Sequence, residues 1–216
     1  MERIICLAIG YCFGLFQTAF LYGKAHHIDI REHGSGNAGT TNALRVLGKK
    51  AGLIVFLGDV LKCFLAVEVA RLLFRSSHPD MLPLLSLYAG AGAILGHNFP
   101  FYLKFKGGKG IAATAGLILA FRWPFLIVAA PLFFLAFFTT HYVSLGSLLV
   151  YAGFMTELVV LGQRGYFGME APLLYEMYAV GAFLTVMAFW KHRENIGRLL
   201  KGTERKTYLL KKNKED

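Results

Sequence analysis

Charged residues are scarce in this sequence: only 17% of its 216 residues are Asp, Glu, Lys or Arg, against about 25% in an average soluble domain. Hydrophobic residues make up 56% of the chain, which excludes a disordered protein and argues against an ordinary soluble enzyme. Cysteine is scarce too, and three cysteines cannot build a disulfide framework in a chain of this length. No His/Cys cluster has the spacing of metal ligands, and no nucleic-acid-reading element appears. We therefore expect a small integral membrane protein with no metal and no nucleic-acid partner.

Apolar runs in the sequence predict helices that span a lipid bilayer, each of which needs about 20 residues. Seven runs can be placed, although some are shorter than this: 4–22, 51–74, 81–96, 110–121, 124–139, 143–162 and 173–190. We predict an all-α integral membrane protein with about seven transmembrane helices, in which residues 1–216 form a single domain.

Lysine and arginine are distributed unequally between the two sides of such a bundle. The side that holds loops 24–50 and 97–110 and the tail from residue 191 carries 17 of them, the other side carries five, and Lys62 lies within a span. Because these residues accumulate in cytoplasmic loops, the bias predicts an external N-terminus and a cytoplasmic C-terminus. It also accounts for most of the net charge of +10.

Residues 34–42 (GSGNAGTTN) form the first of three polar clusters and contain no apolar side chain larger than Ala. Glycines let backbone N–H groups converge on an anion, and Ser, Thr and Asn add short donors. A helix that begins near Thr41 would point its N-terminus at the same spot, with Arg45 one turn inside it. The cluster indicates a phosphate site, and a flexible loop is the alternative.

Gly34, Gly36 and Gly39 also match the GxGxxG pattern of dinucleotide-binding proteins, with Asp59 twenty residues after the last glycine. That pattern requires a preceding strand and an acidic residue at the end of a second strand. Here no strand pattern precedes the glycines, and Asp59 lies within an apolar helix. We therefore reject a nicotinamide cofactor.

The second cluster spans residues 96–110 and combines three lysines with several glycines before a helix expected to begin at Ile111. Lysine charges, a flexible glycine backbone and a helix N-terminus suit the binding of a phosphate. The alternative is a basic cytoplasmic loop that only fixes the orientation of the protein in the membrane. In the third cluster, residues 191–204, the side chains of His192, Asn195 and Arg198 recur every three residues and would share one helix face. Its alternative is a basic helix that binds anionic lipid headgroups.

Two charges lie three residues apart inside the second apolar run, Asp59 and Lys62. Charges are costly inside a bilayer, so we expect the pair to face the bundle interior below the first cluster. It is either a structural ion pair or a support for the site. Ser144, in the turn after the fifth run, returns to the cytoplasmic face and could reach the same place.

The three clusters resemble, in order and over nearly the whole chain, the motifs of the bacterial acyl-phosphate:glycerol-3-phosphate acyltransferase family. The resemblance implies an enzyme of the bacterial inner membrane with its active site at the cytoplasmic face. Such an enzyme transfers a fatty acyl group from acyl phosphate to the sn-1 hydroxyl of glycerol 3-phosphate. It releases 1-acylglycerol 3-phosphate (lysophosphatidate) and phosphate, the first acylation of phospholipid synthesis, and needs no cofactor. Two positions depart from the family pattern: Cys63 stands where Gly is expected, and His141 where Arg is common.

Candidate roles follow from the resemblance and from the residue types. The first cluster is expected to hold the acyl-phosphate head, and Arg45, Lys104, His192 and Asn195 to hold glycerol 3-phosphate, although the two assignments could be exchanged. The candidate catalytic residues are Ser35, His97, Lys104, His192 and Asn195. The candidate binding residues are Gly34, Ser35, Gly36, Asn37, Gly39, Thr41, Asn42, Arg45, Lys104, Gly107, Gly108, Lys109, Gly110, Ser144, His192, Asn195 and Arg198, with Asp59 and Lys62 as support. For the proton of the hydroxyl we favour a substrate phosphate oxygen as acceptor, with His192 as a positioning donor, over His97 or His192 as a base.

Two other functional classes fit parts of the sequence. A phosphate or sugar-phosphate transporter would be expected to show inverted repeats and broken helices near the bilayer midplane, whereas the polar clusters here fall on one face. A non-enzymatic factor that binds anionic lipid would explain the basic tail but not the glycine-rich clusters.

Overall fold

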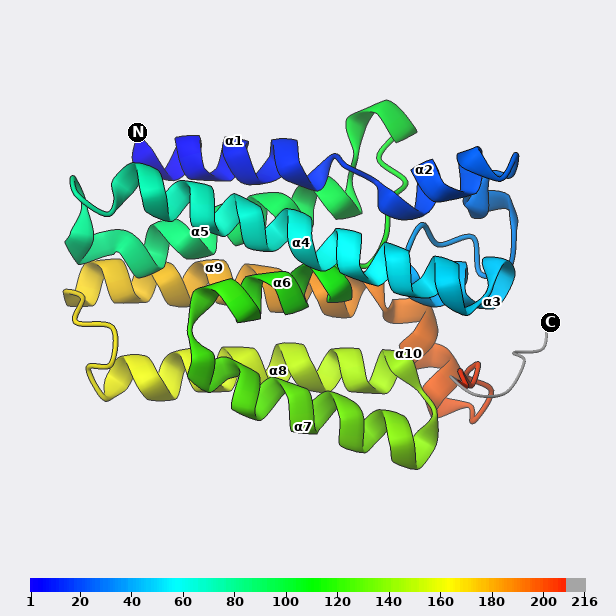
Figure 1. The fold of residues 1–216 in the computed structure, drawn as a ribbon. Coiled ribbons are helices and arrows are strands. Elements are labelled where there is room, and N and C mark those ends of the chain that lie inside the picture. Colours follow the sequence, from blue (N-terminus) through cyan, green and yellow to red (C-terminus); the bar gives the residue numbers. More distant parts are fainter. Residues whose placement is uncertain (209–216) are drawn as a thin grey trace.

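The computed structural model describes residues 1–208, and every regular element in that part of the chain is a helix (Figure 1). The α-helices are α1 (Glu2–Gly14), α2 (Thr18–Ala25), α3 (Thr40–Leu47), α4 (Lys49–Phe74), α5 (Leu82–Asn98), α6 (Ile111–Phe121), α7 (Trp123–Thr140), α8 (Val143–Gln163), α9 (Ala171–Lys191) and α10 (Arg193–Leu200). Three short 3-10 helices are η1 (Ile30–Glu32), η2 (Pro79–Met81) and η3 (Phe101–Leu103). The long helices lie side by side, and the short helices α2, α3 and α10 gather at one end of the bundle. Three lysines counted for the tail, Lys211, Lys212 and Lys214, lie outside the described residues.

Six of the expected apolar runs form α4 to α9, with ends within a few residues of the predicted ones. Four helical segments are long and apolar enough to cross a membrane: Glu2–Ala25, α7, α8 and α9. By contrast, α4 contains several charges, and α5 and α6 have only 17 and 11 residues. The count of seven transmembrane helices therefore remains a prediction, and so does the orientation of the termini.

The first apolar run is expected to be one helix, but Gln17 divides it into α1 and α2. The break frees backbone carbonyls, which find partners from other elements. Lys62 Nζ donates to the carbonyl of Phe16 at 2.7 Å, and the Tyr102 hydroxyl donates to that of Leu15 at 2.7 Å. The side-chain amide of Gln17, itself buried, donates to carbonyls at the ends of α1 and α5. Tertiary hydrogen bonds thus stabilise a break that hydropathy does not reveal.

Small residues allow α1 and α5 to pack closely. A Cβ atom on Gly10 would overlap the carbonyl of Ala89, and one on Gly96 would overlap the carbonyl of Tyr11. Such contacts are the usual way in which helices associate inside a membrane. The close approach places the C-terminal end of α5, which carries the second cluster, directly beside the break at Gln17.

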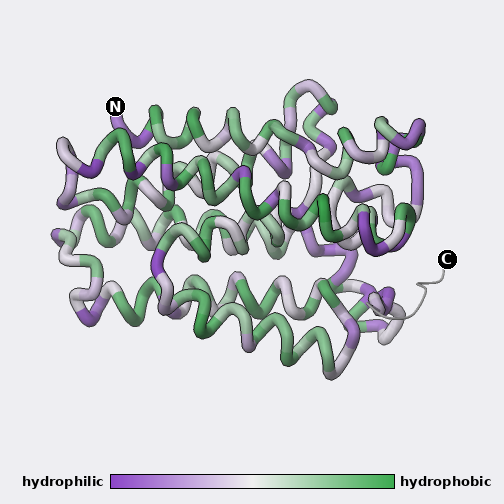
Figure 2. The backbone as a smooth tube through the Cα atoms, viewed as in Figure 1, coloured by the Kyte–Doolittle hydropathy of each residue, from purple (hydrophilic) through white to green (hydrophobic). Residues whose placement is uncertain are grey.

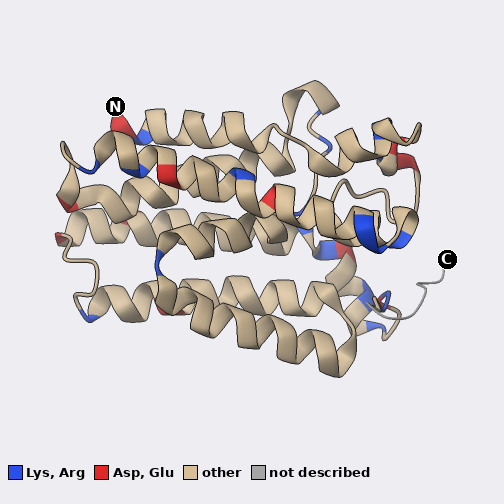
Figure 3. Cartoon of the chain, in the orientation of Figure 1, with Lys and Arg blue, Asp and Glu red and all other residues tan. Residues whose placement is uncertain are grey.

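Polarity changes along the bundle. Apolar residues follow the long helices, whereas hydrophilic residues gather in the loops and at the helix ends (Figure 2). Lysines and arginines concentrate around α3, the loop before α6 and α10 (Figure 3). Large apolar side chains point outward along the helices, for example Leu135 on α7, which is 68% exposed. The bundle therefore has an apolar outer surface and one strongly basic end, where the three predicted clusters meet.

Candidate active site

A polar cavity of about 560 Å³ lies where the three predicted clusters meet. Its walls are the loop 34–42, the loop before α6, the first turn of α8, and the segment from α9 to Thr207. The candidate residues that line it are Gly34, Ser35, Gly36, Asn37, Gly39, Thr41, Asn42, Arg45, Asp59, His97, Gly107, Lys109, Gly110, Ser144, His192, Asn195 and Arg198. Lys62, Lys104 and Gly108 are not among the lining residues.

Asn42 holds the first loop in shape. Its side-chain oxygen accepts from the backbone N–H of Ser35 at 2.8 Å, and its amide nitrogen donates to the carbonyls of Ile30 and His33 at 3.0 and 2.9 Å. Gly34 permits the turn, because its φ of +59° is the left-handed conformation that favours glycine. Asn42 was a candidate for binding substrate, but both of its donor hydrogens are already used within the loop.

The helix after this loop, α3, begins at Thr40, one residue before the expected start, and Gly39 precedes it in an extended conformation. Its first turn lines the cavity, so unsatisfied backbone N–H groups lie close to any anion bound there. Arg45 lies in the last turn of α3 and donates to the hydroxyl of Thr207 at 3.4 Å. The first cluster and the C-terminal segment therefore meet over the cavity.

The loop before α6 turns back on the end of α5. The backbone N–H groups of Gly107 and Gly108 donate to the carbonyls of Asn98 and His97, at 3.3 and 3.1 Å. Lys104 adopts a left-handed conformation with an exposed side chain outside the cavity lining. The loop geometry, which sequence spacing does not reveal, therefore gives no support to the predicted catalytic and binding roles of Lys104.

The third cluster is organised around Glu204. Its Oε1 atom accepts from the Ser144 hydroxyl at 2.8 Å and from the Asn195 amide at 2.6 Å, and its Oε2 atom accepts from Arg198 Nε at 2.8 Å. The Glu204 side chain is only 5% exposed. Helix α10 ends at Leu200, and the chain then returns so that this carboxylate joins α8 and α10.

Lys109 extends the same network into the second cluster by donating to the side-chain oxygen of Asn195. Burial and the nearby Arg198 guanidinium lower the pKa of Lys109 from its ordinary value. The lysine is thus held next to the cavity where an anionic ligand would compensate its desolvated charge.

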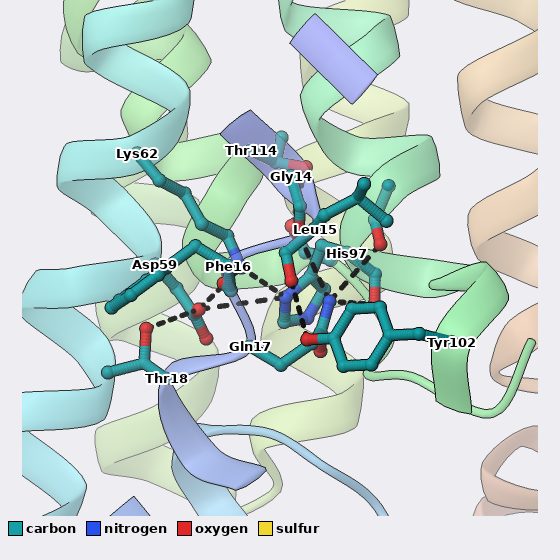
Figure 4. A network of polar contacts seen from close by, with 12 residues as sticks. Gly14, Leu15, Phe16, Gln17, Thr18, Asp59, Lys62, His97, Tyr102 and Thr114 are labelled. Atoms are coloured by element: carbon teal, nitrogen blue, oxygen red, sulfur yellow. Dashed lines mark hydrogen bonds and ion pairs between the residues drawn. The ribbon is translucent and has the colours of Figure 1, made fainter. Parts of the chain in front are cut away.

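Behind the cavity lies a buried polar network that joins α2, α4 and α5 (Figure 4). Asp59 Oδ1 lies 2.8 Å from Lys62 Nζ, accepts from the Thr18 hydroxyl at 3.1 Å, and lies 3.6 Å from His97 Nδ1. Lys62 Nζ lies 2.9 Å from the same His97 nitrogen. The sequence motifs contain no visible His–carboxylate pair, yet the fold brings His97 next to Asp59. Asp59, expected below the first cluster, belongs to the cavity lining.

His192 joins α9 to α10, and its ring nitrogen Nδ1 lies 2.8 Å from the carbonyl oxygen of Ala188. Because a carbonyl only accepts, Nδ1 carries the proton and Nε2 of the neutral ring is an acceptor. Burial keeps the ring neutral by lowering the pKa of His192 to about 4. The expected role as a positioning donor does not fit this arrangement, in which the free nitrogen accepts a hydrogen bond.

An apolar groove adjoins the polar cavity. Residues of α1 and α5 line it, namely Ile4, Leu7, Ala8, Tyr11 and Leu95. Phe99 and Phe105 line both the groove and the cavity. A ligand with a charged head and an apolar chain would fit across this junction.

Comparisons with known proteins agree with this geometry. The model of the family "Glycerol-3-phosphate acyltransferase" matches residues 4–202. A protein of that name from Lactiplantibacillus plantarum is 40% identical over 205 residues, which cover 94% of this chain and 91% of the relative. "Glycerol-3-phosphate acyltransferase 2" of Bacillus cereus is 38% identical over 95% of this chain and 96% of its own.

The chain belongs to the glycerol-3-phosphate acyltransferase family. It is an acyltransferase of phospholipid synthesis and a membrane protein, as the sequence predicts.

Two crystal structures of PlsY (YgiH), described as an integral membrane glycerol 3-phosphate acyltransferase, have the same fold. The glycerol 3-phosphate form has a TM-score of 0.78 and is 31% identical, covering 97% of this chain and 98% of that one. The lysophosphatidic acid form has a TM-score of 0.76, is 30% identical and covers 97% of both chains.

Two features of the site in this acyltransferase were not predicted from its sequence. The first is the role of Glu204, which belongs to the third cluster. An acidic residue six positions after Arg198 could have suggested an ion pair between them. The contact between His97 and Asp59 joins residues 38 positions apart, and no local signal could have revealed it.

Proposed function

We propose that the protein transfers a fatty acyl group from acyl phosphate to the sn-1 hydroxyl of glycerol 3-phosphate, giving 1-acylglycerol 3-phosphate (lysophosphatidate) and inorganic phosphate. The observation that carries this proposal is the junction between a polar cavity and an apolar groove at Phe99 and Phe105. The relatives crystallised in glycerol 3-phosphate and lysophosphatidic acid forms support the acceptor and the product. The widespread HxxxxD signature of other acyltransferases is absent from the sequence, which supports acyl phosphate as the donor.

Two phosphate groups must be bound for this reaction, and the cavity offers two groups of donors. The first consists of the loop 34–42, the N-terminus of α3 and Arg45 from the last turn of that helix. The second consists of Lys109, the glycines around it and Arg198. We assign the acyl-phosphate head to the first and glycerol 3-phosphate to the second.

In the reaction the acceptor hydroxyl oxygen bonds to the acyl carbonyl carbon, and the bond from that carbon to the phosphate oxygen breaks. Much of the rate would come from holding the two substrates in contact, and N–H and ammonium donors would stabilise the oxyanion and the departing phosphate. The proton goes to the departing phosphate. His192 orients the hydroxyl by accepting its hydrogen bond. The departing phosphate takes the proton, because its leaving oxygen gains a negative charge as the bond to the acyl carbon breaks, whereas burial lowers the pKa of His192 to about 4.

The acyl chain would lie in the groove along α1 and α5, with Phe99 and Phe105 where the chain meets its polar head. The outward-facing apolar surface of the bundle makes this groove continuous with the lipid. We place the site at the cytoplasmic face of the bacterial inner membrane, because the basic end of the bundle is the end that the positive-inside rule assigns to the cytoplasm.

The test is product analysis with purified protein, glycerol 3-phosphate and one donor at a time: acyl phosphate, acyl-CoA or acyl carrier protein. With acyl phosphate as the only donor, the enzyme should form 1-acylglycerol 3-phosphate and inorganic phosphate in equal amounts. Efficient turnover with acyl-CoA in the absence of acyl phosphate would contradict the donor assignment. A product acylated at the 2-hydroxyl would contradict the position.

A further inference from the structure

The buried ammonium of Lys62 has three partners and three hydrogens. Nζ lies 2.7 Å from the Phe16 carbonyl oxygen, 2.8 Å from Asp59 Oδ1 and 2.9 Å from His97 Nδ1. A lysine ammonium has three donor hydrogens and no acceptor. The Phe16 carbonyl accepts one of them, His97 Nδ1 accepts another, and the Asp59 carboxylate forms an ion pair with the ammonium.

We propose that Lys62 is a positioning residue that fixes His97 as the neutral tautomer with its proton on Nε2, so that His97 offers the cavity a hydrogen-bond donor and not a base. A ring nitrogen that accepts a hydrogen bond cannot carry a proton of its own, and the other nitrogen of a neutral ring must then be protonated. A doubly protonated ring would place a second cation directly against the ammonium. Lys62 is the cation of the ion pair with Asp59, so its ammonium donates and the ring nitrogen accepts.

Asp59 alone would produce the opposite tautomer. Its Oδ1 atom lies 3.6 Å from His97 Nδ1, and a carboxylate next to Nδ1 normally orients the ring with its proton on that nitrogen. The shorter contact from Lys62 uses the lone pair of Nδ1, which then has no proton to donate to Asp59, and the Thr18 hydroxyl also donates to Asp59 Oδ1. Lys62 thus reverses the arrangement that a His–carboxylate pair would otherwise give.

The free edge of the His97 ring faces the glycine-rich loop. A Cβ atom on Gly108 would overlap His97 Nε2, so glycine at this position lets the loop lie close to that nitrogen without a side chain covering it. His97 itself belongs to the cavity lining. If the proposed function holds, the Nε2–H group would donate to an anionic oxygen there, either on a substrate phosphate or on the acyl oxyanion.

The tautomer can be measured in the full-length protein labelled with ring-¹⁵N histidine in lipid nanodiscs. Nitrogen NMR separates a protonated ring nitrogen from an unprotonated one, and the His97 signals are identified by their loss in His97→Gln. We expect an unprotonated Nδ1 and a protonated Nε2 for His97. His192 provides an internal reference, because its contact with the Ala188 carbonyl requires the reverse pattern. A wild-type His97 with its proton on Nδ1, or on both nitrogens, would overturn the inference without any variant of Lys62.

Lys62→Met tests the cause. With the ammonium removed, the His97 proton should move to Nδ1, towards Asp59, whereas Lys62→Arg should retain it on Nε2. Lys24→Met, at an exposed position on α2, controls for loss of a lysine elsewhere. An unchanged tautomer in folded Lys62→Met would show that Lys62 does not set it. If that variant does not fold, the wild-type and Lys62→Arg spectra still decide the question.

Activity gives a second readout. A single lost donor at an oxyanion typically costs about 10²–10³-fold in turnover, and we expect a loss of this size in His97→Leu. His97→Gln keeps an N–H donor near the position of Nε2 and should retain most of the activity, with the shape of the pH–rate profile unchanged. Equal losses in the two variants would contradict a donor role. An enzyme that fails to acylate glycerol 3-phosphate would refute the proposed function but leave the NMR result intact.

Discussion

Glu204→Gln should disturb the site without removing any side chain from it. The glutamate accepts from Ser144, Asn195 and Arg198, whereas Asn195 in turn accepts from Lys109. A glutamine of the same shape can keep the two contacts at Oε1. Its amide nitrogen would then face the Nε–H of Arg198, donor against donor.

The contact between Glu204 and Arg198 sets the size of the expected loss in kcat/KM. A hydrogen bond to a charged group contributes about 1.5–3 kcal/mol, and the value falls towards the lower end of that range where a partner is solvated. Arg198 is 34% exposed, whereas Glu204 is 5% exposed. We therefore expect a loss of about 1.5–2 kcal/mol, which is roughly a 10- to 30-fold effect at 1.4 kcal/mol per factor of ten.

The effect should appear in kcat/KM for glycerol 3-phosphate, because Asn195 and Lys109 are the groups that the carboxylate holds in place. Glu194→Gln is the matched control: its carboxylate lies 4.0 Å from the same arginine but is 73% exposed, so we expect less than a twofold change. Both variants should be compared at equal amounts of folded protein, with inorganic phosphate release as the measured rate. Equal rates in the two variants would refute the assigned role of Glu204.

Other regions of the chain give further predictions. Ala8→Trp would fill the apolar groove and should shift preference towards shorter acyl chains in a kcat/KM series, whereas Leu135→Trp, on an exposed face of α7, should leave the series unchanged. Because burial lowers the pKa of His192 to about 4, the unfolded chain binds more protons than the folded chain between about pH 4 and 6.5, so this residue should cost up to about 3 kcal/mol of stability as the pH falls through that window. Thermal unfolding of His192→Gln should show a smaller loss of stability over this pH range. The same pH dependence in wild type and variant would contradict the lowered pKa of His192. Single cysteines at Ser35 and Arg164 in a cysteine-free background should react with an impermeant reagent from opposite faces; reaction from the same face would exclude seven spans.

Hydropathy predicted the helices well where each apolar run is bounded by polar or glycine-rich loops. The ends of α4 to α9 fall within a few residues of the expected ones for this reason. Apolar runs alternate with polar loops, and every second loop returns to the same side of the bundle. The three clusters therefore lie at one end. Most candidate residues therefore meet around one cavity, although their spacing in the sequence is wide.

Backbone geometry inside loops and helix breaks was not predictable in the same way. Gln17 divides the first helix because its amide bonds to the carbonyls of Gly96 and His97, about 80 residues away in the sequence. Lys104 leaves the cavity because the loop turns through left-handed residues at Lys104 and Phe105. Both outcomes depend on contacts or conformations that residue type alone does not determine.

His97 and His192 illustrate the same limit in chemistry. Both are buried histidines near an asparagine, and the sequence does not indicate which ring nitrogen of either one carries the proton. The partner of His192 is a carbonyl one helical turn earlier, a local contact that leaves Nε2 as an acceptor. The partner of His97 is Lys62 on α4, which can only donate because an ammonium has no acceptor atom. The two rings therefore present opposite hydrogen-bonding groups to one cavity. His192 can accept a hydrogen bond from the substrate hydroxyl, and His97 can donate one to an anionic oxygen.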